Sequence, residues 1–171
     1  MAVSTSKEIK MKPEDLIVTK TDVKGRITYC NDAFMEFSGY GEEELLGQTH
    51  NIIRHPDMPR AVFRLMWNKL QEGDEFFGVI KNMRKGGGFY WVFSHVIPVF
   101  DLGNLLIGYM SARRYPRPEV VEVFQALYQQ MIEVESQYSN SSEAMDASNQ
   151  LLQDLVAEKG GYDEFICDHY K

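Results

Sequence analysis

A loop near the first third of the chain combines side chains that suit phosphate binding. Arg54, His55 and Asp57 lie together in the segment RHPD. An arginine guanidinium can hold pyrophosphate oxygens in a fork, and His55 can donate to a phosphate or stack on a ring. Asp57 can orient Arg54 or accept from a ribose hydroxyl, although a carboxylate between two prolines is also typical of a turn that caps the next helix. By itself the segment is only a suggestive loop.

Amides and tryptophans elsewhere suit a flat ligand with a hydrogen-bonding edge. Asn82 is an amide within an otherwise apolar strand, and such a group needs a partner if it is buried. Asn31 precedes a helical pattern and is equally typical of a helix cap. Trp67 and Trp91 offer wide apolar faces, but Trp67 has the helical spacing of a core residue. None of these residues suggests a catalytic acid or base, and we expect no enzyme.

Other reactive motifs predict nothing further. His50 and His55 have no Cys or Glu at a spacing that completes a zinc site. The glycines Gly86–Gly88 lack the lysine and the strand-to-helix context of a phosphate loop. Cys30 and Cys167 match no CxxC spacing, so both are expected to be reduced thiols.

The composition predicts a folded domain with an appendage. The chain has 171 residues, of which 44% are hydrophobic and 25% charged, and no apolar run reaches the ~20 residues of a membrane helix. We expect a cytoplasmic protein. The net charge of −7 is uneven: residues 1–115 carry 15 basic and 14 acidic side chains, whereas residues 116–171 carry 3 and 11. An acidic end after a neutral domain argues against nucleic-acid binding.

Strand and helix patterns predict an α+β fold, with a small antiparallel sheet and short helices on one face. Two prolines at residues 115–118 mark the end of this domain. The expected organisation is an N-terminal extension (1–15), the domain (16–115), an amphipathic helix (116–159) and a tail (160–171). The expected strands are at 17–19, 27–29, 76–83, 89–100 and 105–113, and the expected helices follow Asn31, span 42–47 and span 61–70.

Four motifs carry a resemblance to a known family. They are ITYCNDAFMEFSGY (27–40), ELLGQTHNIIRHPDMP (44–59), GVIKNMRKGGGFYWV (78–92) and IGYMSARR (107–114). The chain resembles a PAS domain, and more narrowly the flavin-binding PAS domain of bacterial aerotaxis receptors and their stand-alone energy-taxis relatives. The NDxF, SGY and GYMS elements occur in many PAS domains, whereas HNIIRHPDMP with the downstream KNMRKGG is much narrower.

The resemblance implies a five-stranded antiparallel PAS sheet and an FAD held noncovalently between the sheet and its helices. A signalling partner would read the redox state of that FAD, and the partner implied is a separate, membrane-bound chemotaxis transducer. The residues implied for cofactor binding are Asn31, Asn51, Arg54, His55, Asp57, Trp67, Asn82 and Trp91. Two alternatives stay open: a haem-binding PAS gas sensor, with His55 or His95 as axial ligand, and a cofactor-free PAS adaptor that dimerises.

The segment after Pro118 repeats apolar residues in steps of four and three, which is typical of a heptad seam. We expect one long amphipathic helix that forms a coiled coil or docks on another protein. A helix that lies back on the sheet is the alternative. The predicted interface residues are Val120, Phe124, Leu127, Met131 and Val134. For the tail, the sequence leaves open a loose terminus or a short contact peptide.

Overall fold

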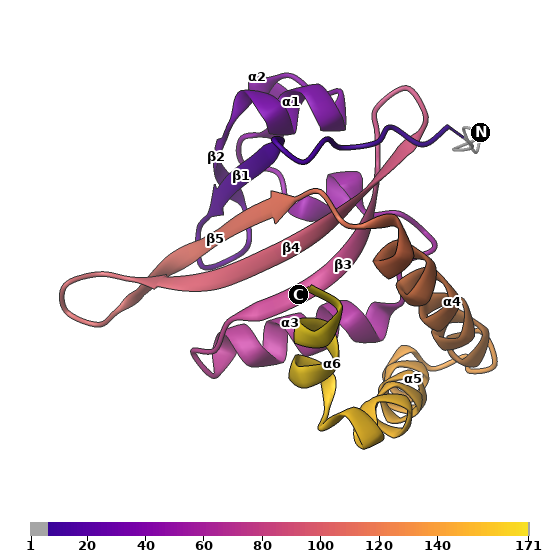
Figure 1. Cartoon of the computed structure of the whole chain (residues 1–171). Coiled ribbons are helices and arrows are strands. Elements are labelled where there is room, and N and C mark those ends of the chain that lie inside the picture. The colour runs from indigo at the N-terminus through magenta and orange to yellow at the C-terminus, as the bar shows by residue number, and fades with distance from the viewer. Residues whose placement is uncertain (1–6, 171) are drawn as a thin grey trace.

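The computed structural model describes residues 7–170, and its centre is a five-stranded antiparallel sheet (Figure 1). The strands follow the spatial order β2-β1-β5-β4-β3. The predicted fold class, α+β with an antiparallel sheet and short helices on one face, is therefore confirmed. The strands are β1 (Leu16–Thr21), β2 (Ile27–Cys30), β3 (Phe76–Met83), β4 (Phe89–Phe100) and β5 (Leu106–Arg114).

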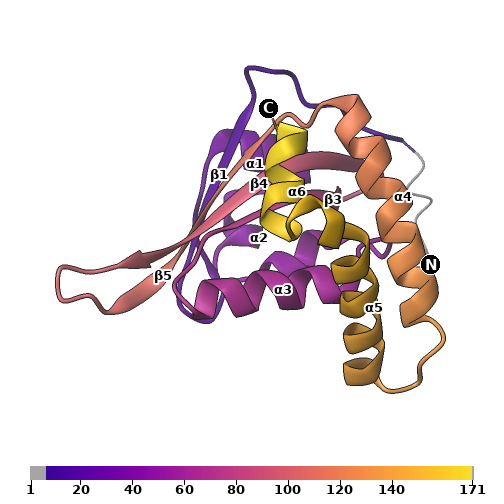
Figure 2. The ribbon, with the colours of Figure 1, turned by 60° about the horizontal axis from the view of Figure 1, so that its bottom comes forward.

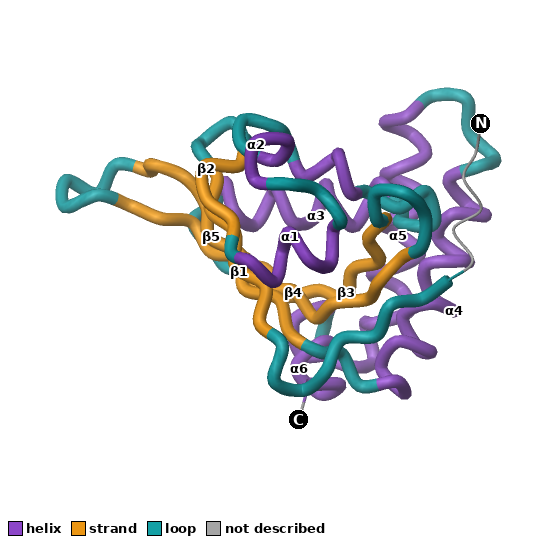
Figure 3. Tube along the Cα trace, turned by 90° about the horizontal axis from the view of Figure 1, so that it is seen from above, coloured by secondary structure: helices purple, strands orange, loops and turns teal. Residues whose placement is uncertain are grey.

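Helices cover both faces of this sheet, as the view in Figure 3 shows for α1 and α6. The elements between β2 and β3 enclose one face, and α4 and α6 lie on the other. The first group is α1 (Asp32–Ser38), α2 (Glu42–Leu45), η1 (His50–Ile53) and α3 (Arg60–Gln71). The helices on the other face are α4 (Pro118–Glu135) and α6 (Tyr162–Tyr170). Helix α5 (Ser141–Val156), which is followed by η2 (Ala157–Lys159), packs against α3 and α4.

Strand alternation divides the side chains between these two faces. On β3, Ile80 and Asn82 line a cavity on the α3 side. Phe77 turns to the opposite face, where it contacts Phe93 of β4. Phe93 in turn stacks on Tyr170 of α6 with ring centroids 4.1 Å apart. Both faces are buried, so the sheet is the central layer of the molecule.

The segment expected to form one helix over 116–159 instead forms a helical hairpin (Figure 2). Helix α4 ends at Glu135, and α5 begins at Ser141. Asn140 separates the two, because its Oδ1 accepts hydrogen bonds from the backbone N–H groups of Ser142 (2.8 Å) and Glu143 (3.3 Å). An asparagine that caps a new helix in this way starts a new direction of chain. The segment is helical and amphipathic, but it is not continuous.

The predicted interface along this segment lies inside the chain itself. Val120, Phe124, Leu127 and Met131 are all buried, with Phe124 and Met131 0% exposed, and Val134 is half-buried. Helix α4 packs with β3 and α5, and its Phe124 contacts Phe165 of α6. These side chains therefore do not form the exposed surface that was predicted to bind a dimer partner or a transducer. The alternative, a helix that lies back on the sheet, describes them correctly.

Both ends of the described chain also pack on the sheet. In the tail, the hydroxyl of Tyr162 donates to the carbonyl oxygen of Phe77 at 2.9 Å, so α6 is ordered against β3. In the N-terminal extension, the N–H of Ile9 donates to the carbonyl of Phe89 at 2.8 Å. None of the helices formed by residues 7–170 is both long and apolar enough to cross a membrane.

Candidate ligand-binding site

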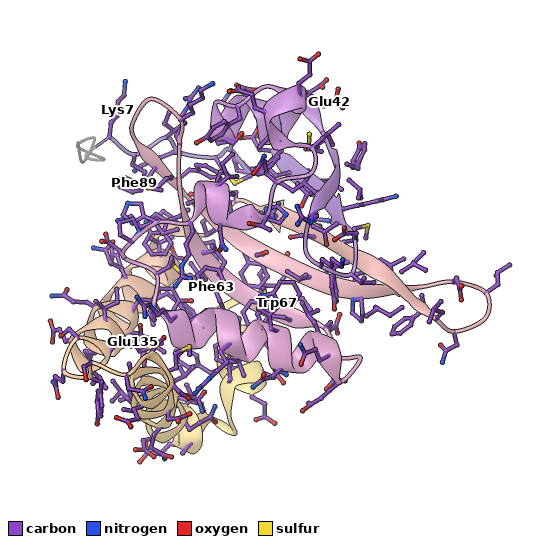
Figure 4. The ribbon with its side chains drawn as sticks, turned by 180° about the vertical axis from the view of Figure 1, so that it is seen from behind. Lys7, Glu42, Phe63, Trp67, Phe89 and Glu135 are labelled. Atoms are coloured by element: carbon purple, nitrogen blue, oxygen red, sulfur yellow. The ribbon has the colours of Figure 1, made fainter. Side chains whose placement is uncertain are left out.

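A cavity of about 650 Å³ lies between the sheet and α3. This volume is in the range of sites for small molecules and cofactors. Its floor comes from β1, β3, β4 and β5, and its roof comes from η1, α3 and one residue of α5, Met145. Phe63 and Trp67 project from α3 towards the sheet (Figure 4) and supply broad apolar surface. The ring of Trp67 also meets Tyr109 edge-on at 5.3 Å.

Asn82 presents an unpartnered donor in this cavity. The residue is 4% exposed, and its Nδ2 has no hydrogen-bond partner among the described residues. Thr21 Oγ1 is a second buried polar atom of the lining without a partner. Buried polar groups in proteins are nearly always paired, so an unpaired one in a cavity wall indicates a place for a ligand atom.

Arg54 lies between this cavity and a second one of about 850 Å³, formed by the 51–60 loop and the turn between α4 and α5. The two cavities share Asn51, Arg54 and Arg60. The Arg54 guanidinium stacks on Phe63 at 4.6 Å, and its Nη2 donates to the Met58 carbonyl at 3.4 Å. Burial and then the nearby charge of Arg60 lower the pKa of Arg54, while Glu135 opposes them. Its remaining N–H groups are available to an anion.

His55 and Asp57 lie outside the first cavity. His55 is buried beside the second cavity, where its Nδ1 accepts from the Asp57 N–H at 3.1 Å and its Nε2 has no partner. Burial and then the positive charge of Lys81 lower the pKa of His55, against the influence of Asp57. The Asp57 carboxylate pairs with Lys81 Nζ at 2.7 Å. Asp57 therefore pairs with Lys81, whereas the sequence analysis suggested Arg54 or a ribose hydroxyl as its partner.

Asn31 and Trp91 lie away from both cavities. Asn31 Oδ1 accepts from the N–H groups of Val18 (3.0 Å) and Phe34 (3.2 Å), and its Nδ2 donates to the Leu16 carbonyl at 2.8 Å. The amide is thus used as a helix cap and a strand clip. Trp91 turns to the outer face of the sheet, where it stacks near Tyr128 of α4 with ring centroids 6.5 Å apart. Of the predicted residues, the first cavity brings together Asn51, Arg54, Trp67 and Asn82.

A polar cluster that the sequence analysis missed forms another part of the wall. Arg113 of β5 is 7% exposed, and its Nη1 donates to Thr19 Oγ1 at 3.1 Å. His50 lies 3.2 Å from the same hydroxyl through Nε2. Burial lowers the pKa of Arg113 to about 10, so it stays charged at neutral pH. Burial and then the Arg113 charge lower the pKa of His50 well below its usual range, so the ring is neutral.

Strand alternation was the signal for this cluster. Tyr109, Ser111 and Arg113 share one face of β5 because they lie two residues apart. Ser111 bonds across the sheet to Ser94 of β4, whose hydroxyl lies 3.3 Å away. The pair of arginines at the strand end is typical of an exposed terminus, and this concealed the buried one. Within the described residues, no group of three His, Cys, Asp or Glu side chains can hold a metal ion.

A comparison with protein families identifies the fold that forms this cavity. The family model described as "PAS fold" matches residues 27–110, the part of the chain that supplies most of the cavity wall. Residues 27–110 are a PAS fold. Solved structures agree: a light-oxygen-voltage domain studied with a flavin analogue has a TM-score of 0.57 at 17% identity, and it covers 67% of this chain and 86% of that one. The dark structure of the Aureochrome1 light-oxygen-voltage domain has a TM-score of 0.57 at 18% identity, covering 70% and 86%.

The sequence relatives of this chain include a receptor and a regulatory protein. The aerotaxis receptor of Escherichia coli is 39% identical over 124 residues, which is 72% of this chain and 24% of the receptor. The nitrogen fixation regulatory protein of Klebsiella pneumoniae is 30% identical over 97 residues, which is 57% of this chain and 20% of that protein. The chain thus spans about a quarter or less of the length of these relatives.

Proposed function

We propose that the chain is a cytoplasmic redox sensor that binds FAD noncovalently in its PAS cavity and signals to a separate chemotaxis transducer. The unpartnered Nδ2 of Asn82 carries this proposal. A buried donor without a partner costs roughly 1–3 kcal/mol, and the carbonyl oxygens of a flavin ring edge would satisfy it. The name of the Escherichia coli relative and the flavin analogue named with one structural neighbour support the same ligand class.

The residues present fit an elongated flavin dinucleotide. Asn82 and Asn51 would hydrogen-bond the ring edge, and Trp67 and Phe63 would pack on its apolar surface. Arg54 would hold the pyrophosphate, because it opens to both cavities and has unused N–H donors. The bound flavin would supply reversible electron transfer. Cys30 is not part of the lining, and burial raises the pKa of its thiol, so a light-driven thiol adduct is not part of this proposal.

A route from the cavity to the rest of the molecule runs through α3. The Glu135 carboxylate, at the end of α4, accepts from the backbone N–H groups of Arg60 and Ala61 at 3.0 Å each. Along the same helix, Arg64 pairs with Asp146 of α5 at 2.8 Å. A ligand that displaces α3 would therefore move the helical hairpin directly. Such coupling needs only a few kcal/mol of difference between two states.

His50 supports haem as a second candidate ligand. It lines the cavity with a neutral ring, and a neutral imidazole is what an axial haem ligand requires. The histidines expected for this role were His55 and His95. His55 lies at the second cavity, and His95 bonds to Glu75 at 2.6 Å on a partly exposed edge. Neither contributes to the lining of the first cavity.

One absorption spectrum of the purified chain distinguishes the candidates. We expect flavin bands, with FAD as the compound released on denaturation and identified by mass spectrometry. A Soret band would show that the bound cofactor is haem and not FAD. No bands, together with no uptake of added FAD, FMN or riboflavin by the folded protein, would overturn the flavin proposal and favour a cofactor-free adaptor.

A further inference from the structure

Arg113 holds a positive charge among neutral groups in the cavity wall. Its Nη2 lies 3.4 Å from both ring nitrogens of His50, and its guanidinium carbon lies 5.5 Å from the ring centre of Phe34. At 3.1 Å, the hydrogen bond from Arg113 to Thr19 is shorter than its two contacts with His50. Among residues 7–170, no carboxylate forms an ion pair with it.

The groups around Arg113 cannot neutralise it. His50 is uncharged at neutral pH, for the reasons given above. Burial raises the pKa of Tyr90, so the phenol stays protonated, and within residues 7–170 its hydroxyl has no hydrogen-bond partner. A charge removed from water is costly unless an opposite charge or several good hydrogen bonds compensate it. The ligand-free wall therefore leaves this cation undercompensated.

The charged side chains of the whole cavity lining are also positive, although the net charge of the chain is −7. The described residues contribute five basic side chains to the cavity and no Asp or Glu. Four of the five, on the loops and on α3, are exposed or half-buried, whereas Arg113 lies in the sheet and is buried. A buried cation in an acid-free wall attracts negative charge far more strongly than one in water. The basic lining residues are Lys24, Arg54, Arg60, Arg64 and Arg113.

We propose that Arg113 is a second anion-binding residue of this cavity, besides Arg54, and that it selects the negatively charged form of the ligand ring. For a flavin, which rests on the function proposed above, Arg113 favours the reduced ring over the oxidised ring. Two electrons from dithionite and one proton from solvent convert the neutral oxidised ring into a reduced ring with one negative charge. Arg113 thus raises the reduction potential of the bound flavin, because only the reduced form meets it as an opposite charge.

The test compares the midpoint potential of FAD-loaded wild-type protein with that of Arg113→Met, Arg113→Gln and Arg113→Lys, titrated with dithionite in a spectroelectrochemical cell. We expect the two neutral variants to lose at least tenfold of the preference for reduced over oxidised flavin. For a two-electron couple this is a fall of about 30 mV. Arg113→Lys should stay near the wild-type potential, because it keeps the charge.

Arg114→Met is the matched control, since Arg114 is exposed at the adjacent position of β5 and lies outside the lining. It should leave the potential unchanged. If both neutral variants that fold and bind FAD keep the wild-type potential, the role of Arg113 is refuted and the flavin proposal stands. If Arg113→Lys falls as far as Arg113→Met, the effect is one of shape and not of charge, which also refutes it. If the wild type takes up no flavin, both proposals fail.

Discussion

The two faces of the sheet are built by the same strands, but they treat their polar groups in opposite ways. On the outer face, the hydroxyl of Tyr128 donates to the Val79 carbonyl at 2.7 Å, and Tyr162 donates to Phe77. On the cavity face, Asn82 Nδ2 and Thr21 Oγ1 have no partner, and Arg113 has no carboxylate. These two outer-face hydroxyls are paired without a ligand, whereas the named groups of the cavity face find no such partner among the described residues.

This difference separates folding from binding within one thin layer. Apolar burial on the outer face stabilises the fold whether or not a ligand is present. Unpaired groups on the cavity face lower the stability of the empty protein and contribute once a ligand satisfies them. Matched changes on the two faces should therefore affect different measurements, and four predictions follow that contrast from the largest effect to the smallest.

The largest effect is expected where α4 meets the outer face. Leu127→Asp together with Met131→Asp places two charges among side chains that are 7% and 0% exposed. We expect a loss of at least about 4 kcal/mol in the free energy of unfolding, measured by urea denaturation, because buried unpaired charges are costly. Val123→Asp on the same helix, where the side chain is 40% exposed, should change little. A folded, flavin-binding double variant that merely fails to self-associate would restore the interface prediction.

The two tryptophans allow the same substitution to be compared on the two faces, because Trp91 lies on the outer face and Trp67 lines the cavity. Trp91→Ala should lower the unfolding free energy of the empty protein by about 3–5 kcal/mol, since the ring is 5% exposed and packed against α4. Flavin affinity of the fraction that folds should be kept. Trp67→Ala should cost less stability and should lower flavin affinity about tenfold, or about 1.4 kcal/mol. Equal loss of affinity in both variants, measured by fluorescence titration, would contradict the separation.

The two asparagines give the same contrast for polar groups. Asn31→Ala removes three hydrogen bonds and should lower the unfolding free energy by about 2 kcal/mol, with flavin affinity unchanged. Asn82→Ala removes an unpaired donor, so the empty protein should lose no stability, or gain some, while its flavin affinity falls. If Asn82→Ala destabilises the empty protein as much as Asn31→Ala does, Asn82 has a structural role.

The smallest effect concerns discrimination between flavins by Arg54. Arg54→Ala should weaken FAD about tenfold, or about 1.4 kcal/mol, and should weaken riboflavin much less, because riboflavin has no phosphate. Isothermal titration of both compounds on the same preparation measures the ratio. Arg60→Ala is a suitable comparison, as Arg60 shares both cavities but its Nη1 already donates to Ser141 Oγ at 3.1 Å. Equal weakening of FAD and riboflavin by Arg54→Ala would assign Arg54 another role.

Local sequence predicted the cavity face better than the outer face. Asn82 stood out because an amide is rare within an apolar strand, and Arg54 because it lies in a loop with other polar groups. Trp91 did not reveal its orientation, because β4 is buried on both sides and its apolar run shows no alternation. Its face follows only from the register, in which Asn82 pairs with Tyr90 and Lys81 pairs with Trp91.

The break in the C-terminal segment was hidden for a similar reason. A heptad pattern in α4 and α5 buries the same side chains whether the partner is another protein or the sheet of this chain. Only the short polar stretch around Asn140 marks the turn, and the apolar frame resumes after it with the same spacing. Arg113 was missed because neither its charge nor its neighbour in sequence indicates burial. Strand alternation puts it on the same face as Tyr109 and Ser111, and the pairing of β1 with β5 brings Thr19 next to it.

The cap on α3 has a consequence for the order in which the chain can fold during synthesis. Pro59, at the N-cap position, has no side chain that can accept a hydrogen bond, and the carboxylate that takes this role comes from Glu135, 75 residues later than Arg60. The first turn of the helix that roofs the cavity therefore keeps open N–H groups until Glu135 has left the ribosome. A nascent chain that ends at residue 115 contains every strand of the sheet, but it lacks Glu135, which caps α3, and Met145, which lines the cavity.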